Sequence, residues 1–229
     1  MINRKFKLWS MIVIGGALIT SLSWLALSDS NVEAEIVHTT QKNGYETAPK
    51  EKIIHTDALY LGFDNVEELD RNADLIIIGS TAEEFQDRKH ITTTFDDGVI
   101  QDFYTLTNLN IDSVIKKPDD SDISTGQTLE AIEPIGYTDP AIKDTKITLN
   151  DYTELEKDIT YIMFLEKNDQ GNYVLINLNL GKFNLEEPEI TTNAMRSLNN
   201  SSENTDQKYN EFWESVKEKY NLNIEDTQL

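Results

Sequence analysis

The longest apolar stretch of the chain lies near its start, where residues 8–27 carry no charged side chain. A helix rises about 1.5 Å per residue, so a helix over this run is roughly 30 Å long, which matches the hydrocarbon core of a bilayer. Arg4, Lys5 and Lys7 precede the run without any acid, and positive residues stay on the cytoplasmic side of a membrane. The pattern predicts a cytoplasmic basic tip over residues 1–7, a transmembrane helix over 8–27 and an exported remainder.

A cleaved signal peptide is the alternative interpretation of this stretch, because residues 32–34 offer small or permissive side chains to a signal peptidase. Against cleavage, the apolar run is longer than the roughly 7–15 residues of a usual signal-peptide core. We expect a single-pass protein of the cell membrane with its N-terminus inside and its domain outside. The alternative is a protein secreted after cleavage near Ala34.

The exported part begins with a polar stretch of little periodicity, which predicts a linker over residues 28–64. Asn65 followed by Glu68 is a capping signal, and it predicts a short helix over residues 65–72. Residues 73–79 then form a short, mostly apolar run rich in β-branched side chains, which is typical of a strand buried on both faces.

Alternating apolar and polar positions predict further strands after this point. Residues 160–165 and 173–178 are two apolar runs joined by a turn that contains Gly171, and they predict a β-hairpin. Other segments are predicted as follows: a turn at 96–98, a long strand over 99–114, a polar loop over 116–126, strands over 127–134 and 146–149, and one helical turn over 152–157.

The chain ends with a predicted helix over residues 206–221, whose apolar residues recur every three or four positions. Such a stripe packs on its own domain or on a partner. The whole pattern predicts a mainly β, α+β fold: a small antiparallel, OB-like β barrel or curled sheet, with an N-terminal transmembrane helix and a C-terminal amphipathic helix. The β domain covers 65–183, a polar connection covers 184–204, and the C-terminal helix and tail cover 205–229.

Four of these segments carry a resemblance to other proteins: residues 73–79, residues 161–165, Tyr173 and residues 181–183. In this order they resemble the landmarks of uncharacterised exported or membrane-anchored small β-domain proteins of Gram-positive bacteria. The resemblance spans about residues 65–183 and implies an exported location and a small β fold, but no activity. The chain departs from the commoner pattern by its acidic loop at 118–122 and by lacking a cysteine for lipid attachment.

Charge and cysteine content narrow the function. The formal net charge of the chain is −21, and removing the three cations of the cytoplasmic tip leaves −24 on the exported part. Such a surface repels phosphate groups, so we expect no binding of nucleic acid. The chain has no cysteine, which excludes disulfides, thiol catalysis and zinc binding through sulfur.

The sequence carries no recognisable catalytic motif. No metalloprotease spacing of histidines, nucleophile elbow or phosphate-binding loop is present, so we assign no catalytic residue and no cofactor. Asp119, Asp120 and Asp122 are the candidates for a calcium site, because closely spaced carboxylates suit this cation. Read as an EF-hand from Asp120, the loop has Thr125 where glycine belongs and Ala131 where glutamate belongs, so that motif fails.

These observations predict a membrane-anchored extracytoplasmic binding or interaction module that is not catalytic. Its expected partners are envelope proteins or wall components. Phe212 and Trp213 are the candidate interaction residues, because one helical stripe does not bury two adjacent large rings equally well. Two alternatives remain: an envelope-polymer hydrolase with a carboxylate pair assembled from distant strands, and a calcium-stabilised secreted domain.

Overall fold

A computed structural model describes residues 52–60, 62–186 and 203–222. The predicted cytoplasmic tip, the predicted transmembrane helix over 8–27 and most of the predicted linker lie outside these residues. Within the described ranges, no helix has both the length and the apolar character needed to cross a bilayer.

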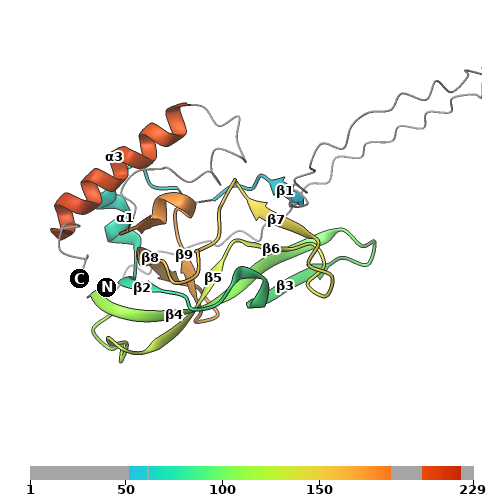
Figure 1. The fold of residues 1–229 in the computed structure, drawn as a ribbon, viewed down its shortest axis with the longest axis horizontal. Helices are drawn as coiled ribbons and strands as arrows, with labels where there is room; N and C mark the ends of the chain where they lie inside the picture. The colour runs from blue at the N-terminus through green and yellow to red at the C-terminus, as the bar shows by residue number, and fades with distance from the viewer. Residues whose placement is uncertain (1–51, 61, 187–202, 223–229) are drawn as a thin grey trace, which may run out of the picture.

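Five strands close into a β barrel (Figure 1). In the order of their pairing around the barrel they are β8 (Tyr161–Lys167), β2 (Leu75–Ser80), β4 (Ile100–Lys116), β5 (Thr128–Glu133) and β9 (Tyr173–Leu175). The barrel closes because β9 also pairs with β8. Only the β5–β9 pair is parallel among these five pairs. The prediction of a mainly β fold with a small barrel is confirmed.

Five further strands lie outside the barrel among the described residues. Three of them form a separate sheet with the order β1 (Lys52–Thr56), β7 (Thr145–Leu149) and β6 (Ile135–Tyr137). Strand β3 (Lys89–Thr94) pairs with the first part of β4, and β10 (Lys182–Asn184) pairs with β8. The helical elements are the 3-10 turns η1 (Phe85–Asp87) and η2 (Leu178–Gly181) and the helices α1 (Val66–Asn72) and α3 (Glu203–Tyr220).

Strand β4 organises the barrel because its 17 residues serve three partners in turn. It pairs first with β3, then with β5 and finally with β2. Its middle part alternates buried and exposed side chains, as the sequence pattern predicted. The β2–β4 register shifts at Gly79, where an added Cβ would lie 2.2 Å from the carbonyl oxygen of Asn110. Only glycine allows the two backbones to approach so closely.

Helix α1 begins where the capping signal predicted. The Asn65 side chain accepts a hydrogen bond from the backbone N–H of Glu68 at 2.9 Å. The Glu68 carboxylate in turn accepts from the N–H of Asp64 at 3.5 Å. These bonds satisfy donors that a helix leaves open at its N-terminus, and the chain then enters β2 directly.

Two apolar cores lie on opposite sides of the barrel wall. Leu75 and Ile77 of β2 point into the barrel, whereas Ile76 points out beneath the helices. Strand β8 divides in the same way, with Met163 inside and Phe164 outside. Both strands are therefore buried on both faces, which explains why their sequences read as continuous apolar runs without alternation.

Helix α3 covers the outer core with its apolar stripe. Phe212 and Trp213 are 4% and 1% exposed, and the Trp213 ring stacks on Phe183 with centroids 5.6 Å apart. The expectation that one helical stripe does not bury both rings equally well is therefore wrong. Helix α3 buries both rings because it packs on α1 and also on the barrel wall, where Trp213 stacks on Phe183 of β10 and Tyr220 lies against Phe164 of β8.

Three local expectations need correction. Strand β1 lies inside the range 28–64 that was predicted as a linker, and it is ordered by parallel pairing with β7 about 90 residues later. Residues 152–157 contain no helix; instead, Tyr152 and Leu155 are buried in the barrel core. Strands β3 and β6 were not predicted, because each is short and takes its stability from a neighbour.

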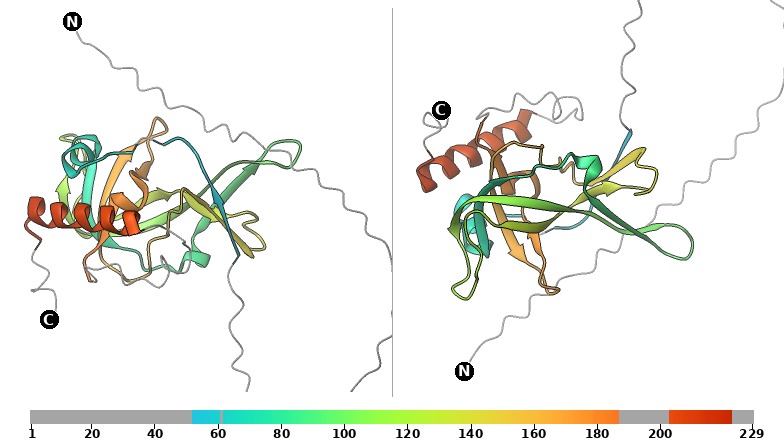
Figure 2. Two further views of the ribbon diagram at one scale, coloured as in Figure 1. Left: turned by 90° about the horizontal axis from the view of Figure 1, so that it is seen from above. Right: turned by 60° about the horizontal axis from the view of Figure 1, so that its bottom comes forward.

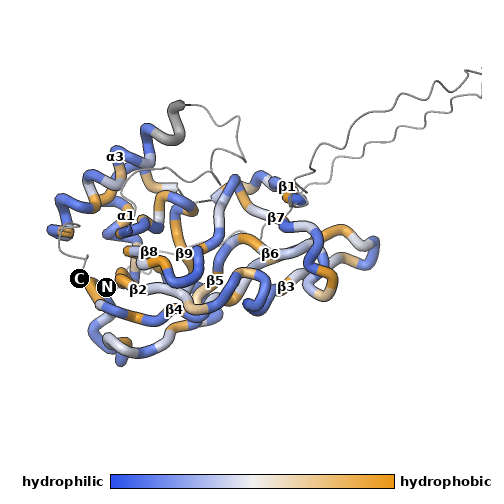
Figure 3. Tube along the Cα trace, in the orientation of Figure 1, coloured by the Kyte–Doolittle hydropathy of each residue, from blue (hydrophilic) through white to orange (hydrophobic). Residues whose placement is uncertain are grey.

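The two ends of the molecule differ. Helices α1 and α3 lie together at one end, and the β3–β4 and β6–β7 hairpins project at the other (Figure 1 and Figure 2). Figure 3 shows that hydrophilic residues dominate α3 and that hydrophobic and hydrophilic residues alternate along β4. The helical end closes the outer core, while the hairpin end extends beyond the barrel.

Candidate functional site

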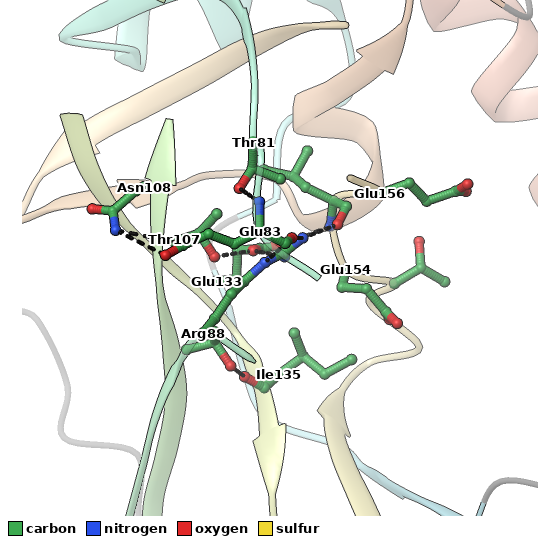
Figure 4. Close-up of polar contacts among 12 residues, drawn as sticks. Thr81, Glu83, Arg88, Thr107, Asn108, Glu133, Ile135, Glu154 and Glu156 are labelled. Carbon is green, nitrogen blue, oxygen red and sulfur yellow. Dashed lines mark hydrogen bonds and ion pairs between the residues drawn. The ribbon is translucent and has the colours of Figure 1, made fainter. Parts of the chain in front are cut away.

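A buried ion pair lies where the barrel meets the β6–β7 sheet. Glu133 is the last residue of β5, on the same face as Ala131, and Arg88 directly follows η1. The guanidinium Nη1 donates to Glu133 Oε1 at 2.9 Å, and both side chains are fully buried. Figure 4 shows these two side chains turned toward each other, with Thr107 of β4 beside them.

Three further donors reach the Glu133 carboxylate. Thr107 donates its hydroxyl to Oε1, and the hydroxyl of Tyr152 donates to Oε2 at 2.8 Å. The backbone N–H of Leu155 donates to Oε2 at 2.8 Å. Each carboxylate oxygen thus accepts two hydrogen bonds, as many as its lone pairs allow in the carboxylate plane. Burial, together with the nearby negative charge of Glu133, raises the pKa of Tyr152 well above its ordinary value, so the phenol stays a donor.

Arg88 is held from the other side by backbone carbonyls. Its Nη2 donates to the carbonyl oxygens of Leu155 at 2.6 Å and Glu83 at 2.9 Å, and its Nε donates to Glu83 at 3.2 Å. Buried charges are tolerated only when they are paired and hydrogen-bonded in this way. The cluster therefore ties the connection after β2, the end of β5 and the segment before β8 into one unit.

Two buried lysines lie close to this ion pair. Lys182 of β10 donates to the carbonyl oxygen of Thr153 and lies 4.4 Å from the centroid of the Tyr152 ring. Burial lowers the pKa of Lys182 to about 8. Lys146 of β7 donates to Glu154 at 2.5 Å. Burial raises the pKa of Glu154, but the charge of Lys146, its hydrogen bond to the carboxylate and the charge of Lys182 together outweigh burial, and the net shift of this pKa is downward.

His90 occupies an aromatic site beside the cluster, with its ring 4.7 Å from Phe85 and 4.6 Å from Tyr137. Its Nδ1 lies 2.8 Å from the hydroxyl of Thr105, which itself donates to the carbonyl oxygen of Ile135 at 2.6 Å. Because that hydroxyl proton is already used, Nδ1 carries the hydrogen and donates it. The Nε2 atom is then an unprotonated acceptor, and it has no partner among the described residues.

This environment keeps the imidazole neutral. Burial lowers the pKa of His90 to about 4, and the positive charge of Lys143 acts in the same direction. The polar groups of the region thus neutralise and position one another. They form a buried junction between the barrel and the β6–β7 sheet.

A second feature lies at the hairpin end, where apolar side chains face solvent. Phe95 and Val99 flank the β3–β4 turn and are 46% and 44% exposed. Ile142, in the turn between β6 and β7, is 66% exposed. Exposed apolar residues gathered at one end of a molecule are a common feature of interaction sites.

The predicted calcium candidates Asp119, Asp120 and Asp122 are exposed in the loop between β4 and β5. Within the described residues, no three acids or histidines are grouped in a way that suits a metal ion. The loop instead directs carbonyl oxygens at a cation of the chain, since Lys117 Nζ donates to Ser121 at 3.1 Å and to Ile123 at 2.8 Å.

Phe212, one of the two predicted interaction residues, lines a groove between α1 and α3. The groove is mostly polar, and Lys208 pairs with Asp64 at 3.1 Å, both of them lining residues. Trp213 is not among the residues of this groove. The helix thus presents mainly polar side chains in the groove, where Phe212 is only 4% exposed.

A comparison with models of protein families finds none that matches this chain, and no curated protein matches it.

The sequence held one signal for the buried cluster. Glu133 shares the alternation phase of the apolar residues Leu129 and Ala131, and this pattern could have indicated a carboxylate inside the barrel. Its partner Arg88 had no such signal, because it lies 45 residues earlier, outside any strand. The exposed Phe95 and Val99 were visible only as residues beside a predicted turn.

Proposed function

We propose that this chain is a non-catalytic binding module displayed outside the cytoplasmic membrane. Residues 8–27 would anchor it, or guide its secretion if cleavage occurs near Ala34, and its partners would be envelope proteins or wall components. The observation that carries the proposal is the packed barrel interior: its buried carboxylate, Glu133, already accepts four hydrogen bonds. A barrel filled in this way binds with its outer surface.

We infer that the barrel is OB-like. Along the chain its strands are β2, β4, β5, β8 and β9, and the third pairs in parallel with the fifth while the first pairs with the fourth. This Greek-key connectivity supports the assignment, and OB barrels bind their ligands on the outside of the barrel wall. Oligonucleotides are disfavoured by the formal net charge of −21.

The location can be tested because the chain has no cysteine of its own. Thr125→Cys places a thiol in an exposed loop of the domain, and Asn3→Cys places one in the predicted cytoplasmic tip. In intact cells we expect a membrane-impermeant maleimide to label Cys at 125 and to label Cys at 3 only after lysis. Labelling of position 125 only after lysis would overturn the proposed location.

The mass of the mature protein separates the two versions of the proposal. A retained anchor leaves the full chain in the membrane fraction, whereas cleavage near Ala34 removes the tip together with the apolar run. The non-catalytic part is tested by incubating the purified protein with isolated wall polymer. Release of new reducing ends above a buffer control would favour the hydrolase instead.

A further inference from the structure

We propose that the hairpin end is a docking surface for a protein that presents an apolar depression rimmed by lysine or arginine. The surface consists of Phe95, Val99 and Ile142, which we call the apolar tips, with the acids around them. This inference deepens the proposed binding function and rests on it.

The first tip is rigid. The N–H of Phe95 donates to the carbonyl oxygen of Val99 at 2.8 Å, and the N–H of Gly98 donates to Phe95 at 2.9 Å. Gly98 has φ +83°, a value that glycine adopts without strain. Strand β3 is paired with β4 along its whole length. Phe95 and Val99 are therefore held in place before any partner arrives, which lowers the entropy cost of binding.

The second tip is held by hydrogen bonds to β3 and to η1. Thr92 of β3 donates its hydroxyl to the carbonyl oxygen of Tyr137 at 2.6 Å, which joins β3 to the end of β6. In the turn that follows, Asp139 accepts from the N–H of Ala141 at 2.8 Å, and Lys143 donates to the carbonyl oxygen of Gln86 at 2.5 Å. Both hairpins project at the same end of the molecule, opposite α3 (Figure 2).

The charge around the tips points to the kind of partner. No lysine or arginine occurs between residues 90 and 115. Lys143, the one cation in the turn 138–144, donates to the carbonyl oxygen of Gln86, and within the described residues no cation forms a salt bridge with the acids near the tips. These acids are Asp96, Asp97 and Asp102 on the first hairpin and Asp139 and Asp144 on the second.

Apolar side chains ringed by acids fit an apolar surface ringed by bases. Anionic lipid repels the same acids, so a bilayer surface is a poor match. A second copy of this chain would place acids against acids. The exposed apolar tips and the acids near them therefore favour a protein partner with an apolar surface surrounded by lysine or arginine.

The first experiment uses the full chain in the cells that produce it. A photoreactive phenylalanine derivative replaces Phe95 or Ile142 and, as a control, Leu59, which is 98% exposed and lies outside both hairpins. We expect positions 95 and 142 to crosslink the same protein and position 59 not to do so.

The second experiment measures binding of that protein, once purified, to this chain. Phe95→Ser or Ile142→Ser should weaken the dissociation constant at least tenfold, whereas the control Leu59→Ser should leave it within about twofold. Asp96→Asn/Asp97→Asn should slow association and reduce its salt dependence. Because all these positions are exposed, the melting temperatures should stay unchanged, so lost binding would not reflect unfolding.

Several results would overturn the inference. Equal crosslinking from positions 59 and 95, crosslinks only to a second copy, or tight binding to phosphatidylglycerol vesicles would each do so. An identified partner that binds the Phe95→Ser variant as tightly as the native chain would also overturn it.

Failure of the proposed location can be distinguished from failure of the docking surface. Labelling of Cys at 125 only after lysis would place the module in the cytoplasm. A partner crosslinked there from positions 95 and 142 would still support the docking surface.

Discussion

At the scale of single residues, the buried charged side chains of this protein stabilise its fold. Arg88 and Glu133 are both fully buried. Apart from the bonds from Arg88 to the nearby carbonyl of Glu83, the hydrogen bonds described around the pair join segments that are distant in sequence. Removing one partner of such a pair leaves the other charge buried without compensation, which costs far more than loss of a surface pair. The cluster therefore predicts a large difference between two superficially similar substitutions.

Arg88→Met should lower the free energy of unfolding by about 3–5 kcal/mol, because it leaves Glu133 as an uncompensated buried carboxylate. Lys157→Met is the matched control, since Lys157 pairs with Glu84 at 3.5 Å on the surface, and its loss should cost less than about 1 kcal/mol. Urea unfolding measures both. Equal effects of the two substitutions would contradict the structural role of the cluster.

His90 gives a pH dependence of known sign. Its pKa is lowered to about 4 by burial and by Lys143, so between about pH 6.5 and 4 the unfolded chain binds a proton that the folded chain does not. Stability should therefore fall as the pH falls through this window, by up to about 3 kcal/mol, and the His90 contribution should level off below pH 4. Arg88 and Glu133 also act on this pKa, in opposite directions.

The measurement is urea unfolding from pH 7 to 4 for the native chain and for His90→Gln, which does not titrate. Carboxylates contribute equally to both, so the difference between the two curves isolates the histidine. If the free energies of unfolding of the two proteins ran parallel over the whole pH range, protonation of His90 would not destabilise the folded state.

At the scale of elements, most segments follow from local pattern. Helix α1 begins at its capping signal, β2 is the doubly buried strand, and β8 and β9 form the predicted hairpin. The errors share one cause: β1, β3 and β6 owe their structure to a neighbouring strand, and residues 152–157 owe theirs to buried contacts. The hydrophobic periodicity of a segment indicates which of its own faces is apolar, but it does not indicate which distant strand the segment pairs with.

The sequence predicted the apolar stripe of helix α3, but only the structure shows which surface the stripe packs on. Trp213→Ala should cost about 3–5 kcal/mol, because the indole is buried and stacks on Phe183. Glu218→Ala, at an exposed position of the same helix, should stay within about 0.5 kcal/mol. Thermal unfolding followed by circular dichroism compares them. An unchanged melting temperature for Trp213→Ala would restore the idea of an exposed ring.

At the scale of the whole molecule, the barrel depends on elements outside the range 65–183 that the sequence pattern marked as the β domain. Helix α3 covers Ile76, Ile162 and Phe183, and β1 extends the sheet that carries Lys146. Burying each large apolar side chain contributes about 1.5–3 kcal/mol, so loss of α3 removes several such contributions. The folded unit is therefore larger than its strand-rich centre.

A fragment of residues 65–183 should melt roughly 10–20 °C below a fragment of residues 52–222, because it exposes the outer core and lacks β1. It should also self-associate, since Phe183 and its neighbours face solvent without the helix. Calorimetry and sedimentation test both statements. Equal melting temperatures would show that the barrel is equally stable without β1 and α3.

The sequence by itself determined the type of most elements, the acidic surface and the absence of thiol chemistry, because these depend on residue identity and on faces that repeat along the chain. It also predicted that residues 160–165 and 173–178 pair as a hairpin, and β8 and β9 do so. Only the tertiary structure decided the closure of the barrel, the pairing of Glu133 with Arg88, the burial of Trp213 and the exposure of Phe95 and Ile142. Each of these joins residues far apart in sequence, and long-range contacts follow from how the whole chain packs its apolar surface rather than from any local pattern.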